Sequence, residues 1–316
     1  MKVPRLFGSD LADRRAVVSL FVTATLLALP FVFSPSFAAQ ILIFAIFALG
    51  YNILLGYGGE MSFGHAAFFG LGAYGAILSV GLLGLPLLAS LLAGVVLATM
   101  GSAVIGKVSL RRRGIGFAMI TLAFAQMFYF IAYRWNAVTG GTDGASYPLE
   151  VEGIGPVSPA AGDLGFYLFC LAVFGIVWLA IARIVDSPFG QVLVAIRENE
   201  KRVRFLGHDP DHMLFVAFVL SGLVSGVAGS LFAVLFAFVT PDVLFWEISG
   251  EVILMTVLGG AGTLVGPVIG AAGFLVLSDQ VTELFDVWTL VFGSIVVVVV
   301  LLAPNGIYGT YLEKWR

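Results

Sequence analysis

Long apolar runs occupy most of this chain and leave little choice of fold. They fall near 16–34, 38–56, 62–81, 85–108, 115–134, 165–183, 213–239, 248–258, 264–278 and 287–303. Most of these runs approach the roughly 20 residues that a helix needs to cross a bilayer. Only 11% of the residues are charged, too few to cover a water-soluble domain of this size. We therefore expect an all-α polytopic membrane protein with about ten transmembrane helices in a single domain, 16–303.

The runs predict helices and not strands. A backbone inside lipid must satisfy its own hydrogen bonds, and the alternating pattern of a membrane β-barrel is missing from the sequence. The runs at 248–258 and 264–278 are short for full crossings. They are interpreted either as two short helices or as one broken helix.

The distribution of lysine and arginine predicts the orientation. With ten crossings and both termini in the cytoplasm, only Arg134 falls outside. The predicted inner segments carry Lys2, Arg5, Arg14, Arg15, Lys107, Arg111, Arg112, Arg113, Arg183, Arg197, Lys201, Arg202, Arg204, Lys314 and Arg316. The cytoplasmic tails are then 1–15 and 304–316, with a periplasmic loop at 135–164 and a cytoplasmic loop at 184–212.

The N-terminal segment has a second interpretation. Basic residues precede the apolar stretch 17–33, and 36–38 resembles a signal-peptidase site. The stretch is longer than the usual apolar core of a signal peptide, about 7–15 residues. We expect an uncleaved first span, with cleavage as the alternative.

Two apparent nucleotide motifs lack the required context. The GxGxxG match at 70–75 lies inside an apolar run with no acidic residue about twenty positions on, and the near phosphate loop at 101–107 is followed by Val108 in place of a hydroxyl residue. These glycines, and the stripe of Gly222, Ser225, Gly226 and Gly229, predict close helix approach instead. Cys170 is the single cysteine, the HExxH and GxSxG motifs are missing, and the three histidines are scattered along the sequence. We therefore expect no enzyme, no cofactor and no metal site.

Glycines interrupt the apolar pattern at two places. A straight spanning helix tolerates such clusters poorly, and irregular backbone at membrane depth survives where protein or a water-filled path covers it. The sequence therefore predicts two broken or re-entrant segments beside a transport path. The glycines of these breaks are Gly56, Gly58, Gly59 and Gly64 in the first, and Gly259, Gly260, Gly262 and Gly266 in the second.

Four polar residues in or beside the spans are candidates for the lining of the path: Asn52, Ser62, His65 and Gln126. Each has a structural alternative. Asn52 and Gln126 can hydrogen-bond between helices, and His65 can hold the first break by bonding nearby backbone carbonyls.

The cytoplasmic loop contains a predicted amphipathic helix over 188–206. Ser187 can cap its start with Pro188 in the first turn, and Gly207 can end it. Glu198 with Arg202 and Glu200 with Arg204 are acid-before-base pairs one turn apart. Such a helix either rests on anionic lipid or docks another subunit.

Four stretches resemble the LivM-type permease subunits of branched-chain amino-acid ABC importers. They are GYGGEMSFGHAAFFGLGAY at 56–74, GIGFAMITLAFAQMFYF at 114–130 with TGGTDG at 139–144, AIRENEKRVRFLG at 195–207 with FVLSGLVSGVAGSL at 218–231, and VLGGAGTLVGPVIGA at 257–271. Because they occur in this order over nearly the whole chain, the chain is identified as a member of that family.

The resemblance implies a heteromeric importer in the bacterial inner membrane. A second permease subunit, two cytoplasmic ATPase subunits and a periplasmic binding protein would be the partners, with membrane lipid and without nucleic acid. The cytoplasmic helix looks like the segment that couples to an ATPase, with Ala195, Arg197, Glu198 and Gly207 at matching positions. Lys201, Arg202 and Val203 depart from the small residues of relatives, so the coupling is expected to be more electrostatic.

The outer turn is expected to contact the binding protein or to form a gate through Thr139, Gly140, Gly141, Thr142, Asp143 and Gly144. Its alternative is a plain glycine turn in which Asp143 bonds nearby amides. Urea, short-chain amides and aromatic acids remain alternative substrates. An ion-coupled carrier would need intramembrane carboxylates or a cation site along the path, and the sequence offers no convincing set. A membrane scaffold would not need two broken helices.

Overall fold

The computed structural model of the chain describes residues 29–146, 164–284, 293–294 and 306–313. The predicted first and tenth spans, the cleavage question and most of both tails lie largely or wholly outside the described residues. The ten-crossing count and the position of the termini therefore stay predictions.

The described part is almost entirely helical. In chain order its elements are α2 (Pro35–Asn52), the π-helical turn η1 (Ile53–Tyr57), α3 (His65–Leu83), α4 (Leu87–Ser109), α5 (Ile115–Arg134), α6 (Asn136–Thr139), the 3₁₀ turn η2 (Gly141–Asp143), β1 (Ala145–Ser146), α7 (Leu164–Asp186), α8 (Pro188–Phe205), α9 (Pro210–Phe236), β2 (Phe238–Val239), the 3₁₀ turn η3 (Pro241–Leu244), α10 (Trp246–Gly259), α11 (Val265–Leu284) and α13 (Gly306–Glu313).

Six helices in the described residues are long and apolar enough to cross a membrane: α2 with η1, α3, α4, α5, α7 and α9. They match the second to seventh apolar runs. The eighth and ninth runs form two separate helices, α10 and α11, joined by residues 260–264, which settles the open alternative in favour of two. With 14 residues, α10 is about 21 Å long and shorter than the roughly 30 Å of a bilayer core.

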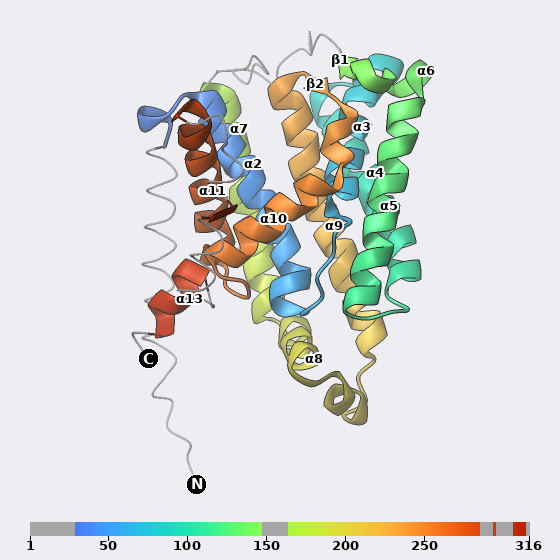
Figure 1. Cartoon of the computed structure of the whole chain (residues 1–316), viewed down its shortest axis with the longest axis vertical. Helices are drawn as coiled ribbons and strands as arrows, with labels where there is room; N and C mark the ends of the chain where they lie inside the picture. Colours follow the sequence, from blue (N-terminus) through green and yellow to red (C-terminus); the bar gives the residue numbers. More distant parts are fainter. Residues whose placement is uncertain (1–28, 147–163, 285–292, 295–305, 314–316) are drawn as a thin grey trace.

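Figure 1 shows a bundle of long helices with α8 outside it at one end and the strand pair at the other. These are called the α8 end and the strand end. At the strand end, β1 and β2 pair antiparallel, with Ala145 opposite Val239 and Ser146 opposite Phe238. The pair ties the turn after α5 to the chain that leaves α9.

The central helix is α2, whose residues from Ala38 to Asn52 are buried with the exception of Gln40. It packs against α7, α9, α10 and α11. A helix that is apolar on all sides is expected to be buried in this way. By contrast, fewer than a third of the residues in the apolar stretches of α4, α5 and α7 are fully buried, as expected of helices that face lipid or another subunit.

Close contacts between glycines hold α3, α4 and α9 together, as the sequence predicts. A Cβ on Gly72 of α3 would lie 2.8 Å from Gly226 Cα of α9, and a Cβ on Gly75 would lie 2.7 Å from Gly94 Cα of α4. Both glycines of the GxxxG pair are used, since Gly222 packs on Ser102 and Gly226 on Ala98. The GxGxxG letters at 70–75 therefore describe helix packing.

Candidate functional site: two helix breaks and the helix outside the bundle

The first break begins where α2 widens into the π-helical turn η1 and continues through non-helical residues 58–64. This segment turns back into the bundle. The Ser62 backbone N–H donates to the Tyr51 hydroxyl (3.2 Å), and the Phe63 N–H donates to Thr121 Oγ1 on α5 (3.2 Å). Side-chain acceptors thus satisfy backbone donors that a continuous helix would have used itself.

The second break, residues 260–264 between α10 and α11, lies against the first. The Asn52 side chain joins them: its Nδ2 donates to the Thr263 carbonyl oxygen (2.8 Å), and its Oδ1 accepts from the Gly262 N–H (2.9 Å). Gly56 packs directly on Asn52 Oδ1 and on Gly262 N, where a Cβ would not fit. The predicted bond across helices is therefore confirmed for Asn52, and the two predicted breaks form one junction at the α8 end.

His65 begins α3 and is fully buried. The Ser221 hydroxyl donates to the Gly50 carbonyl oxygen (2.7 Å), so Ser221 Oγ must accept the 2.7 Å hydrogen bond from His65 Nε2. His65 Nδ1 has no hydrogen-bond partner among the described residues. The histidine holds the break through a serine hydroxyl, and the predicted bonds to backbone carbonyls are not formed.

Gln126 differs from the other three path candidates. Asn52, Ser62 and His65 are completely buried in the described conformation, whereas Gln126 on α5 is half-buried. Its Nε2 has no hydrogen-bond partner among the described residues. The interhelical bond that the sequence allowed is not formed among the described residues, and the Gln126 Nε2 atom is buried there without a partner.

The helix predicted in the loop is α8, and Ser187 caps its start by accepting from the Gly190 N–H (3.5 Å). The helix is not continuous, because Asn199 has extended backbone angles (φ −160°, ψ 93°). Asn199 Oδ1 accepts from the Arg202 N–H (3.0 Å) and restarts the helix. Of the two predicted ion pairs, Glu200–Arg204 is formed (3.0 Å), whereas Glu198 and Arg202 lie on opposite sides of the kink.

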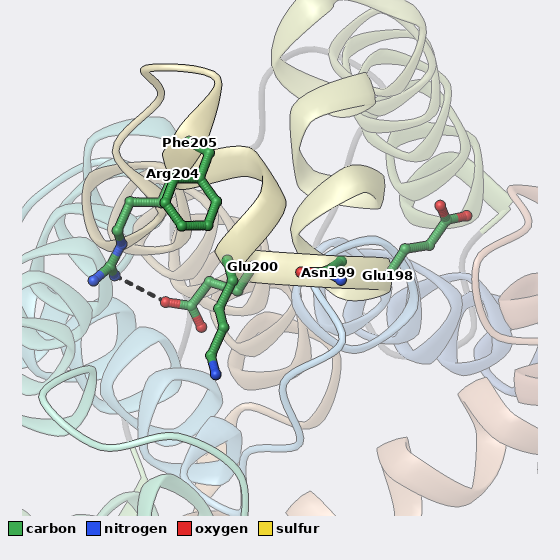
Figure 2. Close-up of a pocket in the computed structure, with 6 residues that line it drawn as sticks. Glu198, Asn199, Glu200, Arg204 and Phe205 are labelled. Atoms are coloured by element: carbon green, nitrogen blue, oxygen red, sulfur yellow. Dashed lines mark hydrogen bonds and ion pairs between the residues drawn. The ribbon is translucent and has the colours of Figure 1, made fainter.

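An open pocket surrounds this kink and is lined by Glu198, Asn199, Glu200, Lys201, Arg204 and Phe205. Figure 2 shows that Glu198 points away from the Arg204–Glu200 pair. The adjacent Phe205 and Leu206 are 90% and 73% exposed, so the end of α8 presents an apolar surface. Ala195 is half-buried, and Gly207 adopts a positive φ (+88°) in open space.

Arg197 is exposed as a whole residue, but its side chain reaches the bundle. Its Nη1 donates to the Gly56 carbonyl oxygen in the first break, and its stem packs on Gly59, where φ is +76°. The resemblance predicts a role for Arg197 toward an ATPase, and that role stays a prediction. In the described conformation its guanidinium is bound within this chain.

A cluster of charges joins α8 to the neighbouring loops, and the sequence analysis did not single it out. Arg113 contacts Glu60 (3.7 Å), Glu200 (3.4 Å) and Asp211, and Arg204 contacts Glu200 and Asp211 (3.3 Å). The five side chains come from four segments: the first break, the loop before α5, α8 and the start of α9. Spacing along the sequence could therefore reveal only the Glu200–Arg204 pair. The one other available signal was Glu60 among the glycines of the first break.

Burial shapes the chemistry of Glu60. Removal from water raises the pKa of its carboxyl above the ordinary value, and Glu200 adds to the rise. The Gly114 N–H, which donates to Glu60 Oε2 (3.1 Å), and the Arg113 guanidinium lower the pKa and only partly offset the effect of burial.

The turn at the strand end is held by hydrogen bonds among its own residues and the end of α5. The Thr139 hydroxyl contacts the Ala132 carbonyl oxygen (2.6 Å), and Gly140, Gly141 and Gly144 have positive φ. Thr142 and Asp143 are exposed, and the described contact of Asp143 is with the Thr142 hydroxyl (3.5 Å) and not with backbone amides. The six residues therefore divide into four that shape the turn and two that point outward.

The fold and this junction define a class: a multi-pass helical membrane protein whose buried helix breaks touch a helix outside the bundle. The family model described as branched-chain amino acid transport system / permease component matches residues 35–303. The chain belongs to that family of permease components.

Individual relatives agree. The chain is 30% identical to the high-affinity branched-chain amino acid transport system permease protein LivM of Salmonella typhimurium, over 96% of this chain and 77% of the relative. It is 29% identical to LivM of Escherichia coli over the same shares. It is 26% identical to permease protein BraD of Pseudomonas aeruginosa, over 84% of this chain and 91% of BraD. No solved structure matches the chain.

Proposed function

We propose that this chain forms half of the translocation pathway of an ATP-driven importer of branched-chain amino acids. A second permease subunit completes the pathway, two ATPase subunits dock at the α8 end, and a substrate-binding protein docks at the strand end. Membership of the permease family carries this proposal, and relatives named for branched-chain amino acid transport support the substrate class. The chain itself supplies the path and its partners supply ATP hydrolysis.

The charges of the described residues support a cytoplasmic α8 end. Arg134 lies at the strand end, next to α6. The other described lysines and arginines lie at the α8 end: Lys107, Arg111, Arg112, Arg113, Arg183, Arg197, Lys201, Arg202 and Arg204. Because cytoplasmic loops collect lysine and arginine, α8 faces the cytoplasm and both termini lie on that side if the chain makes ten crossings.

The outer half of α8 is the proposed ATPase contact. It lies outside the bundle, carries the open pocket around Asn199 and ends in the exposed Phe205 and Leu206. An apolar tip rimmed by charges suits a protein partner better than water. Glu198, which points away from the other charges of the pocket, is free to pair with a basic residue of that partner.

Gln126 is the proposed path residue. A polar amide in a spanning helix faces a protein interior or a water-filled path, and only 22% of the apolar stretch of α5 is fully buried in this chain. Because its Nε2 atom is buried within this chain, Gln126 reaches a path only if the packing around α5 changes. Asn52, Ser62 and His65 reach the path only if the junction of the two breaks opens.

At the strand end, Thr142 and Asp143 are the residues that can touch a binding protein, because they are exposed in a turn whose glycines adopt positive φ angles. An exposed hydroxyl and carboxylate suit contact with a basic or amide-rich surface.

The test is uptake of radiolabelled leucine into proteoliposomes that contain the two permeases and the ATPases, with the binding protein added outside. Uptake is expected to require ATP inside and to be reduced by unlabelled isoleucine and valine. Uptake driven by an ion gradient without ATP would overturn the importer mechanism. ATP-dependent uptake competed by urea, a short-chain amide or an aromatic acid, and not by valine, would overturn the substrate class.

A further inference from the structure

One side chain of α8 touches both helix breaks. Arg197 Nη1 donates to the carbonyl oxygen of Gly56 in the first break. The same nitrogen lies beside Gly262 in the second break, where a Cβ built on Gly262 would be 3.0 Å from it. The aliphatic stem of Arg197 meanwhile packs against Gly59. A single arginine therefore connects α8, outside the bundle, to the junction of the two breaks within it.

The contact with Gly56 has a specific physical basis. The last carbonyls of a helix have no donors within the helix, and the end of a helix carries a partial negative charge. Gly56 lies in η1, at the carboxyl end of the helix that begins with α2. The Arg197 guanidinium thus caps that end with a charge-assisted hydrogen bond, which is stronger than a bond between neutral groups.

The junction that Arg197 touches is internally bonded. Asn52 holds the Gly262 N–H and the Thr263 carbonyl oxygen, and Gly56 packs on the Gly262 backbone without room for a Cβ. A displacement of Gly56 must therefore carry Gly262 with it or break the bonds of Asn52. A pull on the first break is transmitted to the second.

The remaining links of α8 to the bundle are of another kind. The helix packs on α7, on α9 and on the η1 turn, and Glu200 reaches Glu60 of the first break through Arg113. The described side-chain hydrogen bonds and ion pairs of the other α8 residues do not go to Gly56 or Gly262. Arg197 is distinct because its own side chain reaches the junction.

We propose that Arg197 is the positioning residue that transmits movement of α8 to both helix breaks and so keeps ATP use and opening of the path in step. This rests on the proposed function, in which α8 docks an ATPase. It assigns Arg197 an inward role, whereas Glu198, Phe205 and Leu206 face the partner.

The test measures the substrate transported per ATP hydrolysed by the complete complex in proteoliposomes. With Arg197→Ala, hydrolysis stimulated by the binding protein is expected to continue, while transport per ATP falls roughly tenfold because one charge-assisted hydrogen bond is lost. Arg197→Lys, which keeps a charged donor for Gly56 but lacks the width to reach Gly262 as well, is expected to recover part of the ratio.

Arg112→Ala is the matched control, since Arg112 is an exposed arginine at the same end outside α8, and its ratio should equal that of the wild type. A wild-type ratio with Arg197→Ala would overturn the proposal, as would loss of ATPase binding, which would make Arg197 a docking residue. If Arg197→Ala fails to accumulate in the membrane, Arg197→Gln is measured under the same criterion. Wild-type transport without ATP would instead overturn the proposed function itself.

Discussion

At the scale of single residues, Glu60 shows how the helix break creates an unusual carboxyl group. Its side chain is 11% exposed, with the Gly114 N–H, Arg113 and Glu200 around it. The Gly114 N–H and Arg113 lower the pKa of Glu60 by less than burial and Glu200 raise it, so the pKa stays above its ordinary value. The folded chain therefore holds a proton on Glu60 more tightly than the unfolded chain does.

The stability of the chain should depend on pH through this residue. Stabilisation by the proton is complete below the ordinary pKa of 4.5 and is lost as the pH rises through the raised value. The melting temperature of the wild type in detergent, minus that of Glu60→Gln, should thus increase as the pH falls from 7 toward 5. A difference that is flat or decreases over this range would contradict the burial of Glu60.

At the scale of elements, α8 is two helical pieces joined at Asn199. The sequence predicts one helix, because its apolar spacing and its Glu–Arg pairs continue across residue 199. The side chain of Asn199 competes with that pattern by accepting from the Arg202 N–H and starting the second piece. The kink turns Glu198 away from the Glu200–Arg204 pair.

Removing this internal cap should loosen the second piece of α8. Replacing an asparagine cap by alanine costs about 0.5–2 kcal/mol of helix stability. In Asn199→Ala, hydrogen exchange of the amides from Lys201 to Phe205 should quicken, while residues 188–198 exchange as before. Gln191→Ala, at an exposed position in the first piece, serves as the control. Unchanged exchange at 201–205 would show that the cap has no energetic role.

At the scale of the whole molecule, backbone contact between α3, α4 and α9 holds the bundle together. Gly72 lies against the Gly226 backbone, which cannot move aside, whereas Gly101 meets only the end of the Leu71 side chain. Both glycines lie inside apolar helices, but a side chain can be accommodated at Gly101 and not at Gly72.

Gly72→Ala is expected to destabilise the bundle by about 1–3 kcal/mol, the usual cost of forcing a methyl group into a packed interior. Gly101→Ala should stay close to the wild type because Leu71 can rotate. The measurement is the melting temperature of each variant in the same detergent. Equal melting temperatures would mean that α3 and α9 can separate without cost.

The helical membrane class, the six described spans, the two glycine breaks, the start of α8 and the family could all be predicted from the sequence. These depend on local patterns, namely apolar length, glycine clusters, capping residues and the order of motifs along the chain. Lipid leaves the backbone few alternatives, so such patterns are decisive.

The tertiary structure alone decided that the two breaks meet through Asn52, that Ser221 binds His65, that Arg113 gathers three carboxylates and that Arg197 turns inward. The residues of the Asn52 and His65 contacts are 211 and 156 positions apart. No local pattern carries such contacts, because they arise from the way α2, α8, α9 and α11 pack.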